Sequence, residues 1–147
     1  MKFLRVVPIG DGYGAELADG PDPEPAADEA LIEVAASGVN RADLSQIAGR
    51  YPPPAGEPEI LGLEVAGRLV ESGERVCALL AGGGHAQRVA APRGQIFPAP
   101  PGLDLAHAAG IPEAYLTAFL NLVVEGGLSS GGSVLVHAAA SGVGLAA

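Results

Sequence analysis

Apolar residues along this chain recur in short runs that glycine and proline interrupt, and such a pattern predicts many short strands. The run over residues 29–37 alternates, so that Leu31 points to one side of the expected strand and Ile32 to the other. A proline-rich connection, residues 21–25, cannot sit inside a sheet. On these grounds strands are expected at residues 3–9, 15–18, 29–37, 64–69, 75–80 and 85–91.

Three segments carry helix signals instead. Asn40 can cap a helix over residues 40–49, because its side chain suits the first free N–H groups of a helix and Asp43 stands at the third helical position. Leu44 and Ile47 would share the apolar face of this helix. The other two helices, which begin with an aspartate and a proline, are expected at residues 104–109 and 112–124. The last of them carries an apolar stripe and a polar stripe, formed by Leu116, Leu120 and Val123 and by Glu113, Thr117 and Asn121.

The C-terminal stretch combines a strand pattern with a glycine turn. Residues 134–136, Val-Leu-Val, are typical of a strand that a parallel sheet buries on both faces. Residues 142–147 then fit the spacing G-x-G-x-x-A, in which glycines permit a tight turn and a close approach of the backbone to the diphosphate of a dinucleotide. The diphosphate would lie at the start of the following helix. An acidic residue usually accompanies this motif about 20 residues further on, past Ala147.

Composition narrows the possible partners. The chain has 147 residues, and the 48% that are hydrophobic suffice for the core of one domain and the beginning of another. A net charge of −9 without any run of Lys or Arg argues against nucleic acid. No apolar run reaches the length of a membrane span and no signal peptide is visible, so a cytoplasmic protein without a membrane partner is expected. The order of elements predicts an α+β fold, mainly β at first and then the start of an α/β domain.

Neither metal chemistry nor hydrolysis has its usual residue pattern. Zinc requires three or four ligands from Cys, His or carboxylates, but Cys77 is the only cysteine and His85, His107 and His137 lie far apart in the sequence. No metal is therefore expected. Ser141, beside the glycine turn, has no histidine at a recognisable spacing, so the sequence does not reveal a nucleophile with its base.

Several motifs occur in an order that resembles one known superfamily. They are N-R-A-D-L at 40–44, Y-P-P-P at 51–54, I-L-G-L-E at 60–64, A-L-L-A-G-G-G at 78–84, I-P-E at 111–113, T-A at 117–118, V-L-V-H at 134–137 and S-G-V-G at 141–144. Together they cover nearly the whole chain and resemble the medium-chain dehydrogenase/reductase superfamily, most closely its zinc-independent NADPH:quinone oxidoreductases. The resemblance implies a GroES-like, partly open β-barrel over residues 1–110. Residues 111–147 would supply a connecting helix and the first strand and turn of a Rossmann domain.

The chain departs from that pattern at three places. The turn at residues 71–74 is short, which shortens a surface loop. His85 stands where an aromatic residue is usual, and we expect it in a half-exposed strand. Leu63 occupies the position at which the zinc branches carry a histidine ligand, which agrees with a zinc-free protein.

The resemblance implies reduction of quinones or conjugated carbonyls by hydride transfer from NADPH. It implies that Asn40 and Asp43 line the floor near the nicotinamide and that Tyr51 contacts the substrate. Thr117 would hold the nicotinamide carboxamide, and the phosphate-side turn would be Ser141, Gly142, Val143 and Gly144. Simpler roles stay open for these residues. Asn40 and Asp43 would only cap a helix, and Tyr51 would be a surface tyrosine ordered by prolines. The Thr117 hydroxyl would form a hydrogen bond within its own helix.

Other interpretations remain. Glu64 is expected to pair with an arginine or with backbone rather than to act in catalysis. Within the enzyme class the protein would alternatively be an enoyl reductase. In a different class, the chain would be a GroES-like β module without catalysis of its own. We expect the 147 residues alone to bind NADPH weakly or not at all, and the full-length protein to form a homodimer.

Overall fold

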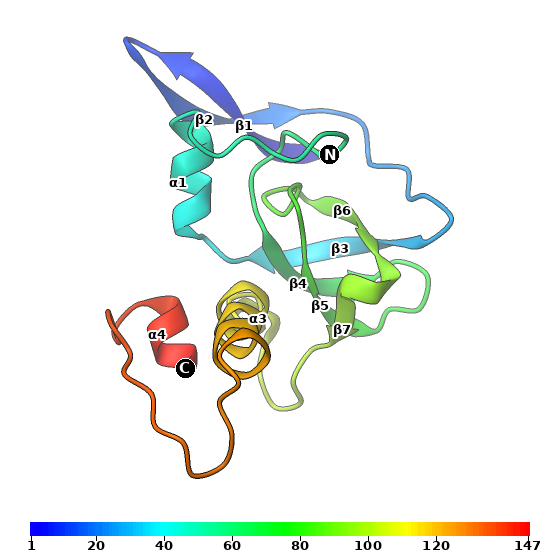
Figure 1. Ribbon diagram of the computed structural model, residues 1–147. Coiled ribbons are helices and arrows are strands. Elements are labelled where there is room, and N and C mark those ends of the chain that lie inside the picture. The colour runs from blue at the N-terminus through cyan, green and yellow to red at the C-terminus, as the bar shows by residue number, and fades with distance from the viewer.

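An antiparallel sheet curls into a partly open barrel at the centre of the molecule (Figure 1). The structure is a computed structural model that describes all residues, 1–147. The strand order of the five-stranded sheet is β6-β3-β4-β5-β7. Its strands are β3 (Glu29–Ser37), β4 (Glu64–Leu69), β5 (Arg75–Leu79), β6 (Arg88–Pro92) and β7 (Ile96–Pro98). This mainly β architecture is the predicted one.

The barrel interior collects the apolar residues that alternate along the strands. Ile32 of β3, Val65 of β4 and Ala78 of β5 are completely buried, and Val89 of β6 is nearly so. Because successive side chains of a strand point to opposite faces, the neighbours of these residues reach the other face or solvent. The exposed Glu33, next to Ile32, is one example. The strand predicted from the alternation at residues 29–37 is therefore confirmed, and the structure shows that its Ile32 face is the buried one.

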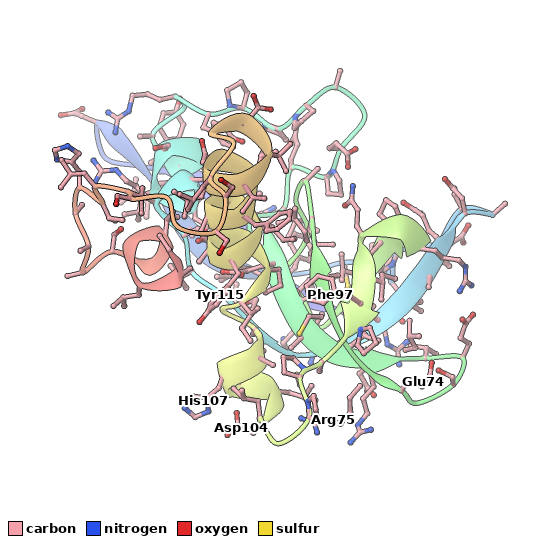
Figure 2. The ribbon with its side chains drawn as sticks, turned by 60° about the horizontal axis from the view of Figure 1, so that its bottom comes forward. Glu74, Arg75, Phe97, Asp104, His107 and Tyr115 are labelled. Carbon is pink, nitrogen blue, oxygen red and sulfur yellow. The ribbon has the colours of Figure 1, made fainter.

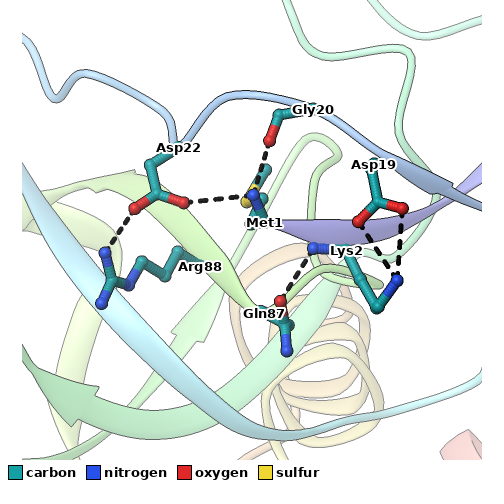
Figure 3. Close-up of polar contacts among 7 residues, drawn as sticks. All are labelled: Met1, Lys2, Asp19, Gly20, Asp22, Gln87 and Arg88. Atoms are coloured by element: carbon teal, nitrogen blue, oxygen red, sulfur yellow. Dashed lines mark hydrogen bonds and ion pairs between the residues drawn. The ribbon is translucent and has the colours of Figure 1, made fainter.

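A hairpin of β1 (Lys2–Ile9) and β2 (Gly12–Asp19) lies beside the barrel (Figure 1). Hydrogen bonds join its first strand to the segment just before β6. Leu4 N donates to His85 O at 2.8 Å, and Gln87 N donates to Lys2 O. Lys2 N in turn donates to Gln87 Oε1 (Figure 3). The N-terminal amine lies 3.4 Å from Asp22, which also pairs with Arg88. These contacts hold the hairpin over the open side of the sheet near β3.

The helices begin where the sequence predicts them. They are α1 (Arg41–Ile47), α2 (Leu105–Ala108), α3 (Pro112–Phe119) and α4 (Gly142–Ala146), with a π-helical turn η2 (Leu120–Glu125) after α3. The expected apolar face of α1 is wrong in part, because Leu44 is 63% exposed while the polar Asp43 and Gln46 are buried. No helix combines the length and the apolar character that a membrane span requires.

Three short elements differ from the sequence prediction. β6 begins at Arg88 rather than at residue 85, because the His85 side chain turns into the interior after three glycines and only Ala86 makes an isolated bridge, to Phe3. The sequence did not predict β7 or the preceding 3-10 turn η1 (Arg93–Gln95). Each has only three residues, which is too short for a periodic signal.

The strand predicted at residues 134–136 does not form. This segment pairs with no other strand, and Val134 and Leu135 are 49% and 81% exposed. A parallel strand is stable only beside neighbours that satisfy its backbone groups, and no strand among the 147 residues lies next to this segment. Of the expected start of an α/β domain, the glycine turn and α4 are present and the strand is absent.

The close packing of β3 on β4 yields a test of the fold. A Cβ on Gly67 would lie 2.2 Å from Glu33 O and 2.9 Å from Ile32 Cγ2, so Gly67→Ala must push the two strands apart. We expect a loss of about 1–3 kcal/mol in the free energy of unfolding, measured by chemical denaturation. Gly94→Ala, where a Cβ meets nothing within 4 Å, is the matched control. Equal stability of the two variants would contradict the register of β3 on β4.

Candidate functional site

A buried carboxylate organises the region between α1, α3 and the sheet. Glu64, the first residue of β4, is only 3% exposed. Its Oε1 accepts a hydrogen bond from Asn40 Nδ2 at 2.8 Å, and its Oε2 accepts one from Glu113 N at 2.9 Å. Burying a charge is costly unless such partners replace water. Glu64 thus joins the residue that caps α1 to the first turn of α3, with backbone among its partners and no arginine.

The approach of Asn40 to this carboxylate depends on a nearby glycine. Gly38 lies between β3 and α1, and a Cβ at this position would stand 2.1 Å from Glu64 Oε1. Gly38 N also donates to the backbone carbonyl of Glu64 at 3.3 Å. The chain can therefore pass over the carboxylate only where it has no side chain.

Asp43 is a second buried carboxylate, 3% exposed, on the inner side of α1. Its Oδ2 accepts from Asn40 N at 2.7 Å and its Oδ1 accepts from Gly62 N at 3.1 Å. Burial raises the pKa of the Asp43 carboxyl, but the hydrogen bonds from His85 and from these N–H groups more than offset it and hold the pKa below its usual range. Asp43 is therefore ionised at neutral pH.

His85 lies between Asp43 and a serine. Its Nε2 is 3.5 Å from Asp43 Oδ2, and its Nδ1 is 2.8 Å from Ser37 Oγ. The His85 side chain is 8% exposed, so the expectation of a half-exposed strand histidine was wrong. Sequence reasoning missed the pair because Ser37 and His85 are 48 positions apart. The tight path of the chain at Gly62, where a Cβ would be 2.4 Å from His85 N, brings them together.

Glu113 and Thr117 extend the buried cluster along the polar stripe of α3. Burial, the charge of Glu64 and, more weakly, the charge of Asp43 raise the pKa of the Glu113 carboxyl, and the Thr117 hydroxyl partly offsets the rise. Thr117 stands one helical turn after Glu113 and is half-buried. The structure thus brings Asn40, Asp43 and Thr117 around one group of carboxylates.

The predicted phosphate-side turn packs against α3. Ser141 Oγ accepts from Gly144 N at 3.0 Å and caps α4. Gly144 has no room for a side chain, because a Cβ would lie 2.4 Å from Ala138 O. A hollow of about 360 Å³ lies between the two helices. Its lining includes Ala118 and Asn121 from the α3 side and Ser141, Val143 and Gly144 from the α4 side. A Cβ added to Gly142 would lie 3.9 Å from Ala114 Cβ of α3.

Tyr51 lies apart from these residues. It follows the end of α1 that is nearest the hairpin, whereas Asn40 is at the opposite end, which faces α3 (Figure 1). Pro52 and Pro53, next to it, line a hollow with Phe3 of the hairpin. The Tyr51 side chain is 49% exposed and makes no hydrogen bond to the other predicted site residues. The 147 residues do not bring Tyr51 and Thr117 into contact.

The structure contains no arrangement of side chains that could bind a metal ion. No group of three or more His, Cys, Asp or Glu residues is placed to hold a metal ion. Cys77 is fully buried and directs its sulfur toward Ala108 O at 3.5 Å. Burial, together with the charge of Glu64, raises the pKa of the Cys77 thiol. Cys77 is therefore a core residue.

The raised pKa of Glu113 predicts a measurable pH dependence of stability. A carboxyl with a higher pKa in the folded state than in the unfolded state stabilises the fold when protonated, and this contribution disappears as the pH rises through the folded pKa. The pH range in which this stability contribution is lost begins near 4.5, the ordinary pKa of a glutamate carboxyl. In Glu113→Gln the contribution is absent, so the variant should gain stability relative to wild type between pH 4 and pH 8.

Chemical denaturation at several pH values checks this expectation. Glu125→Gln, at the exposed end of η2, is the control and should follow the wild-type curve. A constant stability difference between Glu113→Gln and wild type across the range would show that the pKa of Glu113 is not raised in the folded state.

Several proteins of known function or structure are similar to this chain over nearly its whole length. A quinone oxidoreductase from Lama guanicoe is 34% identical over 99% of this chain and 48% of its own length. The quinone oxidoreductase from Thermus thermophilus, solved with and without NADPH, has a TM-score of 0.83 and 39% identity, covering 99% of this chain and 48% of that one. The CurK enoyl reductase has a TM-score of 0.80 and 28% identity, covering 99% and 49%.

The chain spans about half the length of these relatives. The family model of the alcohol dehydrogenase GroES-like domain matches residues 26–101, which include β3 to β7 and the Asn40, Asp43, Glu64 and His85 cluster. The fold, the order of the sequence motifs and these matches all indicate the same family. The chain belongs to the alcohol dehydrogenase GroES-like domain family, within the medium-chain dehydrogenase/reductase superfamily.

Proposed function

We propose that this chain is the substrate-side part of a zinc-independent reductase that transfers hydride from NADPH to quinones or conjugated carbonyls. The observation that carries the proposal is the buried Glu64 carboxylate, which ties Asn40 to the first turn of α3. This bridge joins Asn40 to the helix that carries Thr117, which supports a nicotinamide site between them. Similarity to quinone oxidoreductases from two organisms supports the reaction class.

The proposed roles follow the chemistry of each residue. NADPH, when bound, supplies the hydride, and the protein contributes orientation and exclusion of water. Asn40, held by Glu64 and Asp43, presents a fixed polar surface to the nicotinamide. Thr117 offers a hydroxyl to the carboxamide, and Tyr51 contacts the acceptor from the loop after α1.

The glycine turn fits a diphosphate in part. Ser141 caps α4, and Gly142 and Gly144 carry no side chain that would keep phosphates away. The acidic partner of this motif is expected about 20 residues further along, so residues 111–147 hold the phosphate turn of the proposed Rossmann domain without that partner. Residues 1–110 form the proposed catalytic GroES-like domain.

Two observations favour a zinc-free mechanism. Leu63 stands where the zinc branches of the superfamily carry a histidine, and its apolar side chain cannot bind a metal. The nearby Asp43, Glu64 and His85 use their polar atoms on protein partners. We expect small-molecule substrates, and a homodimer for the complete protein.

Two alternatives have support of their own. An enoyl reductase is favoured by the 28% identity to the CurK enoyl reductase over 99% of this chain. A GroES-like module without catalysis of its own is favoured by the match of the GroES-like domain model to residues 26–101. Cofactor binding and substrate turnover separate these possibilities.

Binding of NADPH tests the first distinction. We expect the 147 residues alone to bind NADPH weakly, and the complete polypeptide that the gene encodes to bind it tightly, as measured by calorimetric titration of each. The physical reason is that the turn at Ser141 would contact only the phosphates of NADPH. The acidic residue that binds the ribose in this motif is expected about 20 residues further along. Tight saturable binding by the 147 residues would contradict the expectation, and no binding by the complete polypeptide would favour the non-catalytic module.

Steady-state kinetics of the complete polypeptide tests the reaction. Oxidation of NADPH is followed with 1,4-benzoquinone and, separately, with an enoyl thioester. Loss of one substrate hydrogen bond in Tyr51→Phe should lower kcat/KM for the quinone about tenfold, equivalent to about 1.4 kcal/mol. Tyr13→Phe, on the exposed hairpin, is the control. Turnover of the thioester alone would favour the enoyl reductase, and an unchanged kcat/KM in Tyr51→Phe would remove this residue from the site.

A further inference from the structure

The arrangement of Ser37, His85 and Asp43 is that of an activated hydroxyl. Ser37 Oγ lies 2.8 Å from His85 Nδ1, and Asp43 Oδ2 lies 3.5 Å from His85 Nε2. The ionised Asp43 favours a proton on the nitrogen that faces it. Nδ1 is then the acceptor, and the Ser37 hydroxyl donates its hydrogen to it. Serine, base and carboxylate stand in the order that nucleophilic catalysis requires.

Ser37 and His85 open on a hollow that the proposed reductase function does not use. It has a volume of about 510 Å³ and lies between the hairpin and β3. Its walls are mostly apolar and include Phe3, Leu4 and Val39. This open, mostly apolar hollow has room for a short acyl chain beside the serine and gives water access to it.

Polar groups that suit a developing negative charge are also present. Gln87 and Lys2 line the same hollow. The Gln87 Oε1 accepts from Lys2 N at 2.8 Å, so the nitrogen of this amide stays available as a donor (Figure 3). The Lys2 ammonium, which pairs with Asp19 at 3.2 Å, is a second N–H donor at this hollow. Such donors stabilise the oxyanion of an acyl-transfer reaction.

We propose that Ser37 is the nucleophile of an acyl-transfer site that hydrolyses small, uncharged esters. Ser37 Oγ attacks the ester carbonyl carbon while its proton passes to His85 Nδ1. The bond from that carbon to the leaving oxygen breaks, and the same proton goes to the leaving alcohol. Water then attacks the acyl group on Ser37, giving its proton through His85 to Oγ and releasing the carboxylic acid. Asp43 stabilises the imidazolium in both steps.

A second pair in the chain supplies the matched control. His107 Nδ1 lies 2.8 Å from Asp104 Oδ1, so it has the base and the carboxylate but no serine. Both side chains are on the outer side of α2 (Figure 2) and are 76% and 64% exposed. Unspecific ester cleavage by an exposed imidazole would depend on His107, whereas the proposed site depends on His85.

The test uses the purified 147-residue chain with p-nitrophenyl acetate and p-nitrophenyl butyrate. We expect hydrolysis above the buffer rate, a loss of about tenfold or more in Ser37→Ala and in His85→Phe, and no change in His107→Gln. His85→Phe retains a ring of similar size. Mass spectrometry of the protein after brief exposure to the ester should locate one acyl group on Ser37. Circular dichroism and thermal unfolding establish that each variant is folded.

Three results would overturn the proposal. The first is a wild-type rate no higher than buffer. The second is a rate that falls in His107→Gln and is unchanged in folded Ser37→Ala or folded His85→Phe. The third is acylation at Lys2 or at the N-terminal amine instead of Ser37. Because no step involves NADPH, the outcome is independent of the proposed reductase function.

Discussion

The structure depends on the burial of the Glu64 carboxylate at the start of β4. An ionised side chain at 3% exposure must replace its lost water with hydrogen-bond donors, and Glu64 finds one on each oxygen. These donors belong to the residue that caps α1 and to the first turn of α3. A single desolvated charge therefore determines how two helices, far apart in the sequence, sit against one end of the sheet.

Two further carboxylates, Asp43 and Glu113, lie in the same region, and their environments shift their pKa values in opposite directions. His85 and N–H donors hold the pKa of Asp43 low, whereas burial and the nearby charge of Glu64 raise the pKa of Glu113. Groups with opposed pKa shifts in one cluster are typical of sites that handle charge. The same cluster places His85 against Ser37 and so connects the proposed reductase face to the hollow under the hairpin.

Much of the architecture was predictable because it depends on local patterns. The alternation at residues 29–37 predicted β3, and Asn40 followed by Asp43 predicted the start of α1. Asp104 caps α2, as expected from its type and position. The predicted strand at residues 134–136 failed because its stability depends on neighbouring strands, which its own residues do not report.

For the candidate site, the sequence by itself determined which residue types were present and which helices carried Asn40, Asp43 and Thr117. It also determined the S-G-V-G turn, since a serine cap and glycines act within a few residues of each other. Only the tertiary structure decided that Ser37 meets His85, because no periodicity links residues 48 positions apart. It also decided that Tyr51 lies away from Thr117, because contacts between loops and helices depend on how the whole chain packs.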